Sequence, residues 1–564
     1  MTRPPPTGYP AAMLAVTPGR AAALLGLLVA ACHAALPFTD YVAYDDRYTI
    51  NWLNQGKLAE LRTFFSMAGN DLGYAYLALF AGLPHLVTVF KVVGVGCAFA
   101  TGWFAFRVGT ASGFLTRAEA LAVAVAAVAI PAFKLKGGAV YSIYDWTIVA
   151  FLLATLLALR AEARTGFGHV ARRAAALGLF ALSFQMPSLL VFYGGFFLLL
   201  TLAHQRTAGG AWFVPPVGFA LRRLDYLALP FVYWVGKDAL FPRWGVYTEY
   251  NRVGPTWERL TAGARGVADV LADPVTLLAA QPAVVVAGVI AAALVGWVVA
   301  VRVLRPGDEA EPETGSAPAC GLIGFGLLLL VMGTFPYAAV GKSPGPWGVP
   351  SSFAPLVPLP FALVLVGVLK LLRVTGRPAV AVLAVVGAVG AFGWWHNALS
   401  WQALEARNRS LVRWLHTDPA ARERTVYGFA NRYVIPRTAD NLYGWEWVYI
   451  EAGEWGVPRS FGFNGVPDGP TPLWFTRKCL DDMTLGYDLT GVNEAGGEGA
   501  VIVRPGTEWS APRVGLKYLW TKHARPARLD ALLDRLVEVE FVPAPYDGAD
   551  VRRRAGPPAP PVER

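Results

Sequence analysis

The sequence predicts a polytopic α-helical membrane protein of about eleven transmembrane helices, with a small α/β or α+β domain at its C-terminal end. Three observations support this fold class. Hydrophobic residues make up 55% of the 564-residue chain and charged residues 16%, against roughly 25% charged in ordinary soluble domains. Apolar stretches near the length of a bilayer span, about 20 residues, recur from residue 20 to residue 398. After residue 400 no such stretch occurs.

The apolar stretches define the expected spans in chain order. They lie near residues 20–38, 85–106, 117–133, 143–160, 174–187, 188–204, 224–241, 276–301, 320–340, 353–372 and 378–398. The fifth and sixth are short and adjoin at Met186-Pro187-Ser188, so a tight turn is expected there. The first stretch has no clear cleavage site of small residues, so we interpret it as a retained helix rather than a signal peptide.

Basic residues set the expected orientation, because loops that stay in the cytoplasm are enriched in Lys and Arg. Residues 1–19 are expected to be a cytoplasmic tail and residues 20–399 the transmembrane domain. The clearest inside cluster is Arg160, Arg164, Arg172 and Arg173. An odd number of spans then places the C-terminal region on the extracytoplasmic side of the inner (plasma) membrane.

The C-terminal region is expected to form an extracytoplasmic domain over residues 400–550, followed by a disordered tail over 551–564. Strands are predicted at 425–429 and 500–503, and an amphipathic helix at 527–539. The net charge of +10 does not indicate nucleic-acid binding, because the basic residues are scattered between apolar runs as membrane loops require.

Paired acids in the first outer loop, residues 38–84, carry the strongest functional signal. Asp45 and Asp46 lie a few residues after the first span, and an amphipathic stretch through Phe64 and Phe65 is expected to lie in the membrane interface. One carboxylate of such a pair can accept a proton as a general base, and two can hold a divalent cation such as Mg²⁺ or Mn²⁺. The alternative is a solvated loop in which one Asp caps the next helix.

A third acid, Asp145, stands at the mouth of the fourth span. An ionisable residue at the edge of a span is a functional candidate, although Asp145 could instead be a helix N-cap. Lys134 and Lys136 precede it on the same side, where they could hold a phosphate.

Basic and aromatic residues recur in the other outer loops and are candidates for substrate binding. For each of them, membrane anchoring is the competing interpretation. They are Lys237, Arg243, Lys342 and Trp347. His85, at the start of the second span, is a further candidate, and for it the competing interpretation is a packed interface residue.

This layout resembles the multi-spanning glycosyltransferases of the C superfamily, which use lipid-linked sugars. The segment Tyr44-Asp45-Asp46-Arg47 is similar to their first acidic motif, and Tyr141-Ser142-Ile143-Tyr144-Asp145 to their second. Within the superfamily the chain looks most like the O-antigen glucosyltransferase type. The resemblance covers residues 20–400 as architecture, and its motifs add Arg47 and Tyr144 to the substrate-binding candidates.

The resemblance implies a polyprenyl-phosphate sugar donor and a glycan, lipid or protein acceptor on the extracytoplasmic side. Asp45, Asp46 and Asp145 would be the catalytic candidates, with Asp45 and Asp46 as metal ligands if a metal is bound. Two alternatives stay open. A transporter or flippase of lipid-linked glycans would place charged residues within its spans, and Lys91 is the clearest such residue. A non-catalytic assembly protein would use its outer domain to bind a partner.

Overall fold

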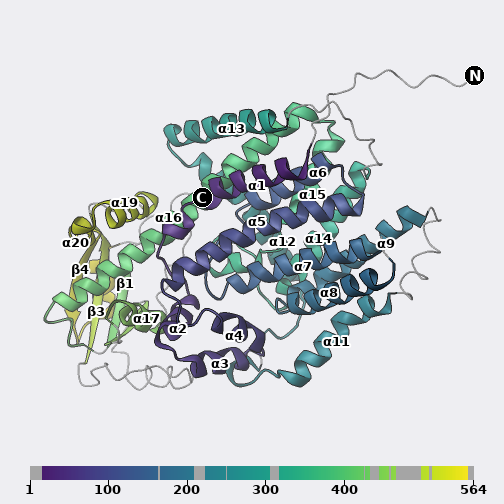
Figure 1. The fold of residues 1–564 in the computed structure, drawn as a ribbon. Coiled ribbons are helices and arrows are strands. Elements are labelled where there is room, and N and C mark those ends of the chain that lie inside the picture. The colour runs from purple at the N-terminus through teal and green to yellow at the C-terminus, as the bar shows by residue number, and fades with distance from the viewer. Residues whose placement is uncertain are drawn as a thin grey trace, which may run out of the picture.

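The computed structural model describes residues 16–162, 165–208, 223–248, 251–304, 317–424, 426–431, 444–455, 459–464, 466, 497–506 and 511–556. A large bundle of helices occupies one side of the molecule, and a sheet with its own helices occupies the other (Figure 1). This arrangement agrees with the expected helical membrane protein that carries a small C-terminal α/β or α+β domain.

Seven helices among the described residues are long and apolar enough to cross a membrane. Their length and composition support the predicted membrane location and transmembrane helices. They are α1 (Pro18–His33), α5 (Leu86–Ser112), α7 (Ser142–Glu162), α9 (Ser188–Ala208), α13 (Ala283–Val303), α14 (Ala319–Ala339) and α16 (Gly376–Thr417).

Four of the eleven expected spans correspond to shorter helices. They are α6 (Arg117–Ala129), α8 (Phe167–Ser183), α11 (Leu224–Leu240) and α15 (Pro358–Leu371), with 13, 17, 17 and 14 residues. The turn expected at Met186-Pro187-Ser188 is confirmed, since α8 ends at Ser183 and α9 begins at Ser188.

The eighth expected span, 276–301, has the wrong bounds. The amphipathic helix α12 (Trp257–Ala279) occupies its first residues, and α13 begins only after Pro282. Pro has no amide hydrogen to continue a helix, so the chain turns at Gln281-Pro282.

The segments that connect the helices lie at two opposite ends of the bundle, as contacts between them show. At one end Lys370 pairs with Glu119 at 2.9 Å, and the amide of Ala317 donates to Phe114. At the other end the amide of Trp244 donates to the carbonyl of Met67, and that of Gly254 to Ala339. We call this second end the loop end; it comprises residues 34–85, 130–141, 241–248 and 340–357.

Three short helices cover the loop end, in place of one interfacial stretch. They are α2 (Asp46–Gln55), α3 (Leu58–Met67) and α4 (Asp71–Ala78). Gly56 ends α2 with a left-handed φ of 69°, which glycine adopts without steric cost. Trp52, Leu61 and Phe65 are buried in one apolar cluster beneath these helices, so aromatic packing rather than helix propensity holds them in place.

Close packing of α16 against α6 depends on glycine. A β-carbon on Gly390 would lie 2.2 Å from the carbonyl oxygen of Ala129, the last residue of α6. Small residues at such positions let helix backbones approach closely, which favours helix association in membranes.

A four-stranded mixed sheet forms the C-terminal domain. Its order is β2 (Phe461–Asn464), β1 (Val426–Asn431), β3 (Glu498–Pro505) and β4 (Val537–Pro543). β1 runs parallel to β2 and β3, and β3 runs antiparallel to β4. Parallel neighbours need crossover connections, which are usually helical, and α17 (Gly444–Trp455) lies between β1 and β2 in the sequence. The other described helices of the domain are α19 (Ala511–Ala524), α20 (Leu529–Leu533) and α21 (Gly548–Ala555).

The predicted strands at 425–429 and 500–503 are confirmed for residues 426–429 in β1 and 500–503 in β3, while residue 425 lies outside the described residues. The predicted helix at 527–539 is wrong over its second half, where β4 begins at Val537. The start of the expected tail forms α21, and residues 557–564 and 1–15 lie outside the described residues. The domain boundary expected at 399–400 falls inside α16, which continues unbroken to Thr417.

Candidate functional site

A strained turn presents the acidic pair. Tyr44 has a φ of 47°, a left-handed conformation that costs a non-glycine residue on the order of 1 kcal/mol or more. Its ring packs edge-on against Trp401 at 5.5 Å, which helps to hold this conformation. The turn ends in the first residues of α2, where Asp45 is the N-cap residue but its side chain makes no capping hydrogen bond. The capping interpretation of Asp45 is therefore wrong.

Asp46 fixes α2 to the loop before α7. Its buried Oδ1 accepts a hydrogen bond from the amide of Val140 at 2.7 Å, and Oδ2 lies directly against Gly138, where a β-carbon would be 2.1 Å away. Burial raises the pKa of Asp46 to about 8, and nearby Asp45 adds to the shift although the Val140 amide and Lys91 oppose it. Asp46 is thus held as a buried, mostly protonated carboxyl at neutral pH.

The replacement Gly138→Ala is expected to destabilise the protein by about 1–3 kcal/mol, because the new methyl group overlaps the carboxyl of Asp46 and pushes α2 away. The melting temperature of the purified protein in detergent measures this. Gly96→Ala in α5 is the matched control, since a β-carbon there meets nothing within 4 Å. Equal melting temperatures for both variants would contradict the close contact between Asp46 and the loop.

Asp45 has different surroundings and remains partly exposed. Burial raises the pKa of Asp45 to about 6, while the positive charge of Lys342 opposes this shift, and the pKa stays below that of Asp46. Lys342, one of the predicted substrate-binding residues, therefore acts through its charge on the more accessible acid. A carboxylate that titrates near neutrality beside a cation can exchange a proton with a bound hydroxyl group.

Asp145 pairs with Lys136 at 2.5 Å, in the first turn of α7. It is buried, and its Oδ2 atom has no hydrogen-bond partner among the described residues. The pair sits on the loop that also contacts Asp46 through Val140, so both acidic motifs meet there. Because the negative charge of Asp145 offsets the positive charge of Lys136, Lys136 should attract a phosphate less strongly than the sequence suggested.

Lys134 and Trp347, two predicted substrate-binding residues, meet at an acid that the sequence did not single out. Lys134 forms a buried ion pair with Asp273 of α12, and the indole nitrogen of Trp347 donates to the same carboxylate at 3.1 Å. The side chains of Lys134 and Asp273 are each 3% exposed. This cluster ties α12 and the loop at 340–348 to the bundle, which is a structural role.

The remaining predicted residues have varied surroundings. His85 is exposed at the N-cap of α5. Lys237 lies near the C-terminal end of α11, and the exposed Arg243 follows it and lies beside Gly69, between α3 and α4. Tyr144 packs against the rings of Phe133 and Tyr141.

Lys91 anchors the segment that leads to the acids. Its buried ammonium group donates to the carbonyl oxygens of Thr39 and Tyr41, each at 3.0 Å, and to the hydroxyl of Thr39 at 2.8 Å. It also lies 3.7 Å from the centre of the Tyr41 ring. The sequence showed Lys91 as a charge within a span. Only the fold shows that its ammonium group binds the backbone carbonyls of Thr39 and Tyr41.

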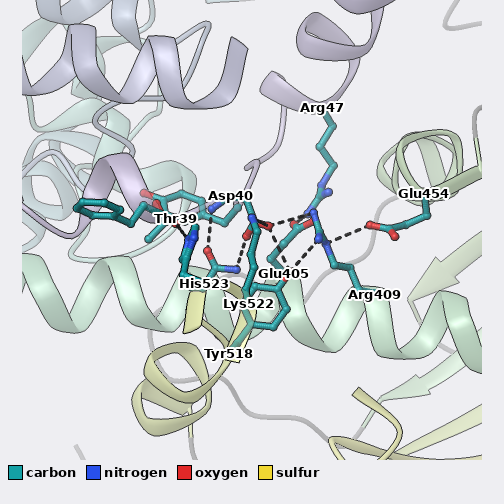
Figure 2. A network of polar contacts seen from close by, with 12 residues as sticks. Thr39, Asp40, Arg47, Glu405, Arg409, Glu454, Tyr518, Lys522 and His523 are labelled. Atoms are coloured by element: carbon teal, nitrogen blue, oxygen red, sulfur yellow. Dashed lines mark hydrogen bonds and ion pairs between the residues drawn. The ribbon is translucent and has the colours of Figure 1, made fainter. Parts of the chain in front are cut away.

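A partly buried ionic network joins the acidic turn to the C-terminal domain (Figure 2). Arg47, the residue after the two acids, pairs with Glu405 of α16 at 2.9 Å. Arg409, one turn further along α16, contacts Glu405 at 3.5 Å, Asp40 at 3.3 Å and Glu454 of α17 at 3.1 Å. The predicted substrate-binding residue Arg47 is thus engaged within the protein.

Asp40 is the second centre of this network. Lys522 and Tyr518 of α19 contact its carboxylate at 2.6 and 3.2 Å, and Gln402 of α16 donates to it at 2.5 Å. Burial favours the neutral acid, but the charges of Arg409 and Lys522 outweigh burial and lower the pKa of Asp40 to about 2. These partners lie hundreds of residues from Asp40 in the sequence, so no local sequence pattern indicated that they would contact it.

The acids do not form a complete metal site. No group of three or more His, Cys, Asp or Glu residues suited to a metal occurs in the described part of the chain. Asp46 already contacts the Val140 amide and Gly138, which leaves Asp45 as the accessible ligand. Mg²⁺ is usually held by one or two carboxylates together with waters and substrate phosphates, so Asp45 is the residue here that would hold a metal, and the proposal below does not depend on one.

No model of a known protein family matches this chain, and no curated protein is similar enough to count as a relative. The resemblance to the C superfamily therefore depends on the residues of the chain alone.

Proposed function

We propose that this protein is a membrane glycosyltransferase of the C-superfamily type that transfers a hexose from a polyprenyl-phosphate donor. The acceptor is a hydroxyl group of a glycan, lipid or protein on the extracytoplasmic side. The observation that carries the proposal is an accessible carboxylate, Asp45, whose pKa is lowered by the positive charge of Lys342 at the loop end of an apolar bundle. Together the two residues supply a proton acceptor and a cation suited to a leaving phosphate.

In the proposed reaction, Asp45 accepts the proton of the acceptor hydroxyl while the hydroxyl oxygen bonds to the anomeric carbon of the sugar. The bond between that carbon and the phosphate oxygen breaks, and its electron pair leaves with the polyprenyl phosphate. Lys342 stabilises the negative charge that develops on this phosphate. Asp46 and Asp145 are positioning residues in this scheme, because their carboxyl groups hold the loop before α7.

We propose eleven spans, with the short helices α6, α8, α11 and α15 completing the bundle. The N-terminus then lies in the cytoplasm, and the loop end and C-terminal domain lie outside the inner membrane. Basic residues support this orientation: Arg160, Arg172 and Arg173 lie in helices at the end opposite the loop end, while Arg164 lies outside the described residues. Helices of 13 to 17 residues can span where the bilayer thins or flanking side chains snorkel.

The pH profile of transfer is expected to follow Asp45. Because the pKa of Asp45 is raised to about 6, the carboxylate needed to accept a proton disappears as the pH falls below about 6. The rate should therefore rise with pH and reach half its plateau near pH 6. Lys342→Gln should move the midpoint to higher pH, since Lys342 lowers this pKa. Initial rates in detergent across the pH range measure both, and a flat profile would reject Asp45 as the base.

The transfer assay itself tests the function. Membranes that contain the protein are incubated with radiolabelled polyprenyl-phosphate hexoses, and label is followed into lipid, glycan and protein fractions. Membranes from cells without the protein are the control. Label that moves only with the protein present supports the proposal. No movement from any donor, with the protein correctly inserted, would overturn it.

The transporter alternative gains no specific support. Its main sequence feature was Lys91, and the ammonium group of Lys91 is bonded to Thr39 and Tyr41 in the first loop.

A further inference from the structure

One face of α19 is both apolar and basic, although it belongs to the domain outside the bundle. Leu516 and Trp520 are 55% and 62% exposed, and Arg513 and Lys517 are exposed beside them. The spacing of these four residues, three or four apart, places them on a single stripe of the helix. Exposed large apolar side chains that cluster in this way commonly mark an interaction surface.

The chain around this stripe has a strong bias in charge. Residues 511–528 contain no Asp or Glu, and their five Lys and Arg residues are Arg513, Lys517, Lys522, Arg525 and Arg528. Lys522 is engaged with Asp40, whereas Arg525 and Arg528 are exposed. The surface therefore favours an anionic partner.

Contacts place both ends of α19 where the spans leave the bundle. Near its start, Gly515 lies against the backbone of Leu399 in α16, where a β-carbon would be 2.0 Å from the Leu399 oxygen. Near its end, His523 contacts the carbonyl oxygen of Phe38 at 3.2 Å. Phe38 is the last residue of the first candidate span and is itself 62% exposed.

Leu399 and Phe38 lie at similar depths. The indole of Trp395 donates to the carbonyl of Ala31 at 2.7 Å, and Gln402 contacts Asp40, so Leu399 on α16 is level with the residues just before Phe38. Residues near both ends of α19 contact the chain at the depth of Leu399 and Phe38. The helix therefore lies across the end of the bundle where the first span and α16 leave it. Figure 1 shows α19 beside the part of α16 that leaves the bundle.

From this position and composition we propose that the exposed stripe of α19 binds the bilayer surface, with Arg513 and Lys517 on anionic phospholipid head groups and Leu516 and Trp520 in the interface. An amphipathic helix with basic and aromatic residues binds membranes in this way, and each basic residue near an anionic surface adds to the attraction. The proposal depends on the chain spanning a membrane but not on the glycosyltransferase activity.

Depth-dependent quenching tests the proposal on the full chain in liposomes. The cysteines Cys32, Cys97, Cys320 and Cys479 are replaced by Ala, and an environment-sensitive fluorophore is attached at Trp520→Cys. Liposomes contain phosphatidylcholine with phosphatidylglycerol and a lipid spin-labelled near its head group. The matched control is Arg553→Cys on α21, where the side chain is 76% exposed and the helix packs on β1 and β3.

We expect strong quenching at position 520 and little at position 553. The double change Arg513→Glu with Lys517→Glu should remove the quenching at position 520 and leave position 553 unchanged. If this variant does not elute as a folded protein, high salt applied to the parent should weaken the quenching instead, because salt screens surface charge. Quenching at position 520 no greater than at position 553 would overturn the proposal and favour a protein partner. Equal quenching in pure phosphatidylcholine would reject the role of anionic head groups.

Discussion

Replacing Asp45 by Asn is expected to lower the rate of sugar transfer by about 10²- to 10⁴-fold, the usual contribution of a general base. Asn has nearly the same shape but cannot accept the proton of the acceptor hydroxyl. The side chain of Asp45 makes no capping hydrogen bond, so its replacement should leave α2 in place. Initial rates at saturating donor, in membranes matched for protein abundance, measure the effect.

Asp46→Asn is the matched comparison for this experiment. Asn keeps an oxygen that can accept the Val140 amide hydrogen bond, and Asp46 is already held mostly protonated by its raised pKa. We therefore expect a much smaller loss of transfer, seen mainly as a lower melting temperature. If Asp46→Asn abolishes transfer and Asp45→Asn does not, the assignment of the base is reversed. If neither variant loses transfer, the acidic turn is not catalytic.

Replacing Asp273 by Ala is expected to destabilise the protein by about 3–5 kcal/mol, because it leaves the ammonium group of Lys134 buried without its counter-charge. It also removes the acceptor of the Trp347 indole hydrogen bond. Thermal unfolding in detergent, followed by size-exclusion chromatography, measures the loss. The control is Asp269→Ala, one turn earlier on α12, where the side chain is exposed and removal should change little.

A double variant separates charge from packing in this cluster. Lys134→Met with Asp273→Leu removes both charges and fills the space with apolar groups, which is often neutral or stabilising. We expect it to melt well above Asp273→Ala. A double variant as unstable as the single one would mean that the pair acts through shape rather than charge.

Local apolarity allowed the main spans to be predicted, because a run such as that of α13 has few alternatives in a membrane protein. The same criterion failed at α12, where the apolar residues after Pro274 continue almost without a break into α13 and only Gln281-Pro282 marks the turn. It also failed at β4. The run through Val537 suits a helix locally, but pairing with β3 decides its conformation.

Only those residues of the candidate site that belong to short local motifs could be predicted from the sequence. Asp45, Asp46 and Asp145 stand out because acids are rare beside spans. Asp273 did not stand out, because a lone acid on an amphipathic helix is ordinary. The roles of Asp40, Glu405 and Arg409 could not be predicted, because each depends on a contact with the others. Asp40 is more than three hundred residues away in sequence from its partners on α16.

The unbroken length of α16 has a consequence for insertions and deletions. Its 42 residues form a rod of roughly 63 Å that packs against α6 at Gly390 and carries Glu405 and Arg409 beyond the bundle. Adding one residue between these points would turn the far end by about 100° and advance it by about 1.5 Å. Glu405 and Arg409 would then point away from Arg47 and Asp40. Natural variants of this protein should therefore keep the residue count between Gly390 and Arg409 constant, because any change in that count would reorient Glu405 and Arg409.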